Sequence, residues 1–128
     1  MSALATQTFS ATLPDDAAAF PQRKAGRNDI LEEIRALKRQ ILPDEKMILF
    51  GSRARGDARE DSDWDLLVLL DKDEINFNED FNKYSAPFIP IELNHGTCIS
   101  IILKTKKNWE TQPSMLKYFV EKEGVEIA

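Results

Sequence analysis

Two stretches decide the fold of this chain: MILFGSRARGD, residues 47–57, and SDWDLLVLL, residues 62–70. Met47 to Phe50 is a short apolar run that ends at a glycine, as is typical of a strand buried on both faces. Ser52 is placed to cap a brief helical turn, which Gly56 would end. The sequence therefore predicts a strand, a tight turn, a polar loop and a second strand.

The second stretch alternates with the period of a strand. Side chains of successive strand residues point to opposite faces, so Asp63 and Asp65 share a face with Leu67 and Leu69. At ~3.3 Å per residue the two carboxylates are separated along the backbone by roughly 6–7 Å. The pattern predicts a pair of acids at the start of an otherwise buried strand.

The turn between the strands has the features of an anion site. Gly51 and Ser52 begin a helical turn, where unpaired N–H groups favour anions, and Arg53 and Arg55 add positive charge. The spacing of the two glycines resembles the start of a P-loop, but Asp57 stands where that motif needs lysine. The G-x-G-x-x-G dinucleotide fingerprint is also missing. Phosphate binding is therefore predicted by a different kind of turn.

The acids and the turn together predict nucleotidyl transfer. Oxygen ligands from Asp63 and Asp65 suit Mg²⁺ or Mn²⁺ rather than zinc. Two such ions about 3.5–4 Å apart can activate an attacking hydroxyl and neutralise a leaving pyrophosphate. The Gly51 turn would position the outer phosphates of ATP or another nucleoside triphosphate.

The rest of the chain predicts a small mixed sheet covered by helices, in the α/β class. Residues 1–27 lack apolar periodicity and are expected to form a loose arm, and residues 28–128 are expected to form the domain. The remaining expected elements are helices at 28–41, 71–84 and 115–121, strands at 89–93 and 98–104, and a hairpin at 94–97.

Composition restricts the classes of partner and compartment. A net charge of −5 argues against a broad grip on long nucleic acid. Cys98 is the single cysteine in 128 residues, so no internal disulfide can form and a cytoplasmic location is expected. No apolar run approaches the ~18 residues of a membrane span.

The motif Gly51-Ser52, ten residues and then Asp63-x-Asp65 resembles the signature of the DNA polymerase β-like nucleotidyltransferase superfamily. It is most similar to the small free-standing members called minimal nucleotidyltransferases, and the resemblance covers about Ile30 to Val125. It implies the polymerase β-like fold. It also implies that Gly51 and Ser52 contact the triphosphate and that Asp63 and Asp65 bind the metals.

The family adds a third carboxylate from a later strand, and here two positions compete for that role. Glu92, in the expected strand at 89–93, would point away from its apolar neighbours and could act as a metal ligand and catalytic group. In the strand at 98–104 the position similar to the family's aspartate is Ser100, which cannot replace a carboxylate. The resemblance therefore leaves the third acid open.

Two functions follow from the resemblance. The first is an enzyme that moves a nucleoside monophosphate from ATP to a hydroxyl acceptor. The alternative is an antitoxin-like or regulatory protein that binds a small helical partner, with weak catalysis or none. An exposed sheet edge would also allow a homodimer.

Overall fold

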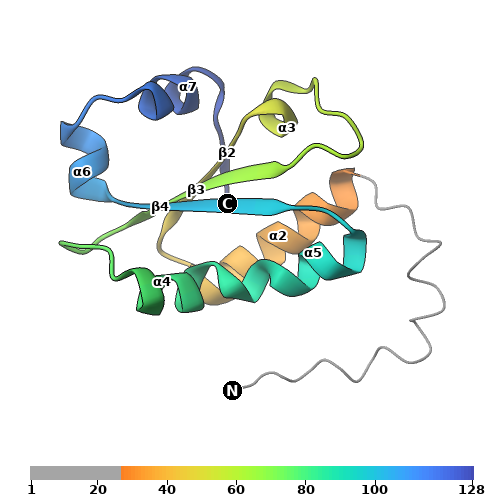
Figure 1. The fold of residues 1–128 in the computed structure, drawn as a ribbon, viewed down its shortest axis with the longest axis horizontal. Helices are drawn as coiled ribbons and strands as arrows, with labels where there is room; N and C mark the ends of the chain where they lie inside the picture. Colours follow the sequence, from red (N-terminus) through yellow and green to blue (C-terminus); the bar gives the residue numbers. More distant parts are fainter. Residues whose placement is uncertain (1–26) are drawn as a thin grey trace.

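The computed structural model describes residues 27–128, which are built around a four-stranded sheet in the order β4-β3-β2-β5 (Figure 1). Strand β2 is antiparallel to both β3 and β5, whereas β3 and β4 run parallel. The strands are β2 (Lys46–Phe50), β3 (Trp64–Leu70), β4 (Ile99–Thr105) and β5 (Val125–Ile127). The predicted mixed sheet with covering helices is confirmed.

Helices lie on both faces of this sheet. Figure 1 shows α2, α4 and α5 on one side, with α6 and α7 on the other and α3 at the end where β2 stops. The helical elements are α2 (Arg27–Ile41), α3 (Ser52–Arg55), α4 (Phe77–Tyr84), η2 (Ala86–Phe88), α5 (Ile89–His95), α6 (Lys106–Thr111) and α7 (Met115–Glu123).

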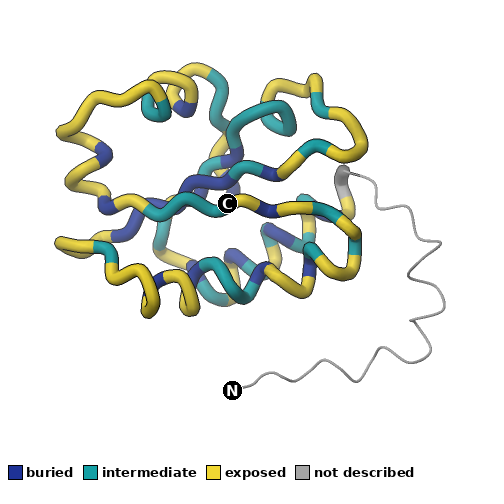
Figure 2. The backbone as a smooth tube through the Cα atoms, viewed as in Figure 1, coloured by how far each residue is buried: buried dark blue, intermediate teal, exposed yellow. Residues whose placement is uncertain are grey.

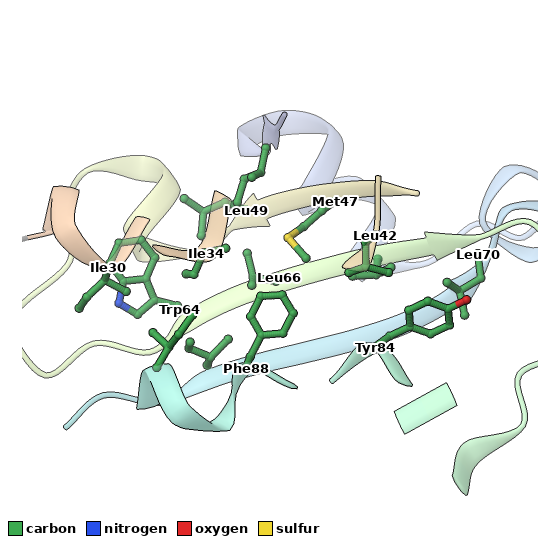
Figure 3. Packing of buried hydrophobic residues seen from close by; sticks show 14 residues of the cluster. Ile30, Ile34, Leu42, Met47, Leu49, Trp64, Leu66, Leu70, Tyr84 and Phe88 are labelled. Atoms are coloured by element: carbon green, nitrogen blue, oxygen red, sulfur yellow. The ribbon is translucent and has the colours of Figure 1, made fainter. Parts of the chain in front are cut away.

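The alternation of β3 divides the core into two clusters. Trp64, Leu66 and Val68 pack with α2, η2 and α5. Figure 3 shows Trp64 and Leu66 near Ile30 and Ile34 of α2 and Phe88 of η2. Leu67 and Leu69 pack with α6 and α7 on the opposite face. Buried positions therefore follow the central strands (Figure 2). Asp65 alternates with Leu66, so it belongs to the α6–α7 face.

The prediction of a strand at residues 89–93 is wrong, because these residues form helix α5. Pro90 lies in the first turn of that helix, where the missing N–H of proline costs nothing. The predicted hairpin at 94–97 is also wrong. Gly96 has φ 61° and ends α5 with a left-handed cap, after which the chain enters β4.

Smaller differences concern element ends and short elements. The predicted helix at 71–84 begins only at Phe77, because the Asn76 side chain accepts the N–H of Glu79 and caps it. Gly51 rather than Ser52 occupies the capping position of α3. Helix α6 and strand β5 were not predicted. The predicted arm at 1–27 lies almost wholly outside the described residues, since α2 begins at Arg27.

None of the helices between residues 27 and 128 combines the length and the apolar character that crossing a membrane requires.

Candidate functional site

The turn after β2 depends on a glycine. Gly51 has φ 78° and ψ −161°, a region that is essentially restricted to glycine. A Cβ on Gly51 would overlap the carboxylate of Asp65. Asp65 is the register partner of Phe50 on the adjacent strand, which brings its side chain to this turn. The fold therefore places the Asp65 carboxylate directly against the Gly51 backbone.

The two aspartates interact electrostatically. Asp63 immediately precedes β3 and is exposed, whereas Asp65 is the second strand residue and is half-buried. Partial burial raises the pKa of the Asp65 carboxyl above its ordinary value of 3.8, and the charge of Asp63 raises it further. Arg55 acts in the opposite direction. Burial and the charge of Asp63 both make the ionised form of Asp65 less favourable. A cation bound at this site would reduce this penalty.

Gly51→Ala is expected to lower the free energy of unfolding by about 2–4 kcal/mol, because backbone strain and displacement of the Asp65 carboxylate add. Gly56→Ala is the matched control. Gly56 has φ 91°, but an added Cβ would meet nothing within 4 Å. That variant should lose about 1–2 kcal/mol from strain alone. Urea unfolding measures both, and equal losses would show that the contact with Asp65 does not constrain the turn.

Arg55 is held by two carboxylates. Its Nε lies 3.1 Å from Asp57 Oδ2, and its Nη1 lies 3.1 Å from Glu123 Oε2. Glu123 Oε2 also accepts the N–H of Gly51 at 2.9 Å. Glu123 was not among the predicted site residues, since it follows Gly51 by 72 positions and no local pattern links the two. The structure thus adds an acid from the end of α7 to the turn.

Arg53 has a different environment. Its Nη2 donates to the carbonyl oxygens of Ser62 at 2.9 Å and Glu60 at 3.1 Å. Its guanidinium also lies 4.7 Å from the centre of the Trp64 ring. These contacts tie α3 to the loop that leads into β3. The structure therefore gives Arg53 a role in holding this loop, and its contact with phosphate stays a prediction.

Contrary to the prediction, Glu92 does not lie beside Asp63 and Asp65. It lies on α5, on the sheet face opposite Asp65, and its Oε2 accepts the N–H of Ile99 at 2.7 Å. The expectation failed because it required a strand at 89–93. Ser100 is instead the register partner of Asp65 on β4. Partners in a parallel pair point to the same face, so Ser100 is the neighbour of Asp65 on the site side.

The donors present fit a cation that arrives with a triphosphate. Within residues 27–128, no three His, Cys, Asp or Glu side chains are grouped so as to hold a metal ion. Mg²⁺ commonly takes one or two protein carboxylates and completes its shell with water and substrate phosphates. Asp63 and Asp65 suit that arrangement better than a cage made of protein alone.

Comparison with protein families matches residues 28–127 to the nucleotidyltransferase domain. Among curated proteins, the chain is 41% identical to the protein adenylyltransferase MntA of Aphanizomenon flos-aquae (strain 2012/KM1/D3). That match covers 47% of this chain and 43% of the relative. The similarity therefore spans less than half the length of that protein.

Solved structures share the fold. A toxin–antitoxin crystal structure with AMP-PNP superposes with a TM-score of 0.54 at 18% identity, covering 77% of this chain and 72% of that chain. A mutant of the toxin–antitoxin MntA–HpeT gives 0.52 at 15% identity, covering 77% and 71%. At such low identity the likeness concerns the fold alone.

Proposed function

The chain belongs to the nucleotidyltransferase domain family, and on this premise we propose that it transfers AMP from ATP to a hydroxyl group of a partner protein. One observation carries the proposal. The Asp65 carboxylate, with the charge of Asp63 near it, lies against the Gly51 turn. The name of the relative, a protein adenylyltransferase, supports the choice of nucleotide and acceptor.

In the proposed reaction the hydroxyl oxygen attacks the α-phosphorus of ATP. The bond from that phosphorus to the bridging oxygen breaks, pyrophosphate leaves and the hydroxyl proton passes to solvent. Asp63 and Asp65 would hold Mg²⁺ or Mn²⁺, which when bound neutralises phosphate charge. The N–H of Ser52 at the start of α3 and the guanidinium of Arg55 would orient the outer phosphates, while the N–H of Gly51 is held by Glu123.

Radiolabelled ATP tests the proposal with a pool of cellular proteins as acceptor. Label from the α-phosphate is expected on protein, and label from the γ-phosphate is not, because pyrophosphate is the leaving group. EDTA should abolish labelling, and excess Mg²⁺ should restore it, because without the cation the two carboxylates would repel the negatively charged triphosphate. Transfer of the γ-label, or full labelling in EDTA, would contradict AMP transfer by this site.

A second function is favoured by Ser100. A serine beside Asp65 leaves the site one carboxylate short, which suits an antitoxin-like protein that acts by binding. The toxin–antitoxin names of the structural neighbours support a small helical partner. Large exposed apolar side chains on α7 are compatible with a protein contact, namely Met115, Tyr118 and Phe119.

Variants separate the two functions. If the Asp63→Asn and Asp65→Asn variants still bind a helical toxin partner and still neutralise its toxicity, binding alone is enough for neutralisation. That result would support the second function. Loss of neutralisation together with loss of labelling supports AMP transfer. A homodimer through the edge strands β4 and β5 also stays a prediction.

A further inference from the structure

We propose that Glu123 is a positioning residue of this site, which fixes Gly51 and Arg55 in the arrangement that receives the outer phosphates of a nucleoside triphosphate. This role depends on the proposed function and extends it to α7. Glu123 itself would touch neither the reacting hydroxyl nor the α-phosphorus.

The sheet brings Glu123 to the turn. Strand β5 begins two residues after Glu123, and its first residue, Val125, is the register partner of Leu49 on β2. Gly51 follows Leu49 by two residues. The end of α7 and the end of β2 are thus fixed side by side by strand pairing. The contact does not depend on a flexible loop.

The low exposure of the Glu123 side chain indicates a firm contact. Its side chain is only 13% exposed. A carboxylate removed from water needs partners, and here these are the N–H of Gly51 at 2.9 Å and the Nη1 of Arg55 at 3.1 Å. One carboxylate therefore links the Gly51 turn to the guanidinium of Arg55.

Arg55 is oriented by contacts on two of its nitrogens. Asp57 binds its Nε and Glu123 binds its Nη1, each at 3.1 Å. A guanidinium is planar, so fixing two nitrogens also fixes the direction of the third. In the part of the chain that the structure describes, Nη2 of Arg55 makes no hydrogen bond. The side chain is 46% exposed, so solvent or a phosphate can reach it.

An arginine held in place need not be ordered when the triphosphate binds. Ordering a long side chain costs enough to weaken binding by about three- to tenfold. Loss of the Glu123 charge should therefore weaken the binding of ATP, whose outer phosphates meet Arg55. The binding of AMP, which lacks those phosphates, should be unchanged.

The test compares Glu123→Gln, Glu123→Ala and a control, Glu121→Gln. The Glu123→Gln variant keeps an acceptor for the Gly51 N–H but loses the ion pair with Arg55. Glu121 is an exposed acid on the same helix, so its replacement changes the net charge equally. Calorimetry with Mg²⁺ measures the Kd of ATP, AMP and inorganic tripolyphosphate, and thermal melting follows the fold of each variant.

The expected result for Glu123→Gln is a Kd for ATP and tripolyphosphate raised about three- to tenfold, with the Kd for AMP unchanged. Glu123→Ala should show a larger loss, and Glu121→Gln none. Unchanged or tighter ATP binding by Glu123→Gln would overturn the role of Glu123 alone, as would equal losses for ATP and AMP. A parent protein that binds none of the three ligands would overturn the proposed function as well.

Discussion

Asp65→Asn is expected to lower AMP transfer at least about a hundredfold while the fold is retained. The carboxylate lies against the Gly51 turn. There it would hold the metal ion that neutralises the charge of the phosphates. Asparagine has nearly the same size but lacks the charge that a hard cation needs. Labelling from α-³²P ATP measures the loss, and circular dichroism checks the fold.

Asp61→Asn is the matched control for this variant. Asp61 lies in the loop before β3, its side chain is 85% exposed, and its replacement removes the same charge. Its labelling rate should stay within about twofold of the parent, as is usual for a solvent-screened charge. Persistent labelling in both Asp63→Asn and Asp65→Asn would exclude the pair as the metal anchor.

Asp65→Asn should also stabilise the metal-free protein at neutral pH. Because folding raises the pKa of Asp65 above 3.8, the folded chain holds this proton more tightly than the unfolded chain. Stability therefore falls as pH rises from the unfolded pKa to the folded pKa, and the cost is complete above the folded value. Asparagine removes this cost, so the variant should melt at a higher temperature at pH 7 and lack this pH dependence.

Ser100→Asp is expected to raise the rate of AMP transfer at limiting Mg²⁺ at least about tenfold. Ser100 is the register partner of Asp65, so an aspartate there would add a third carboxylate on the same face. Without metal, the added charge should lower the melting temperature because it opposes the neighbouring carboxylates. Mg²⁺ should then stabilise the variant more than the parent.

Ser100→Asn is the control, since it has the size of aspartate without its charge. Rates across a Mg²⁺ titration separate metal affinity from other effects. If Ser100→Asp and Ser100→Asn behave alike, a third ligand at this position is not what limits the site. If both variants slow transfer, the serine hydroxyl itself contributes to the reaction. If only Ser100→Asp slows transfer, the added charge hinders the site.

The sequence predicted the centre of the molecule well because local chemistry controls it. Local sequence alone defines these elements. An apolar run that ends at a glycine predicts β2 and the turn, and an alternating pattern that begins with two acids predicts β3. The family motif lies in this same stretch. Its two aspartates could therefore be identified before any tertiary contact was known.

The prediction of a strand at residues 89–93 is wrong because the sequence signals there suit both a strand and a helix. The order Ile-Pro-Ile-Glu-Leu alternates apolar and other residues with period two, and proline is common at strand edges. Proline is equally common in the first turn of a helix. Packing of Ile91 in the main core favours the helix. In this helix the Glu92 carboxylate accepts the N–H of Ile99 at the start of β4.

The contacts of Glu123 could not be predicted, for a different reason. They depend on β5, a strand of only three residues whose pairing with β2 spans most of the domain. No periodicity can be recognised over so few residues. Only the pairing of β5 with β2 in the folded sheet places Glu123 beside Gly51.

The separation of 72 positions between Gly51 and Glu123 has a consequence for how the protein is made. At about 5–20 residues per second, a ribosome needs roughly 4–14 s to add that many residues. Strand β2 precedes Gly51 and exists at the start of this interval, and β3 and β4 are synthesised during it, whereas the carboxylate of Glu123 that holds the turn is added only at its end. The turn at Gly51 should therefore become ordered late in biogenesis, after most of the sheet has been synthesised.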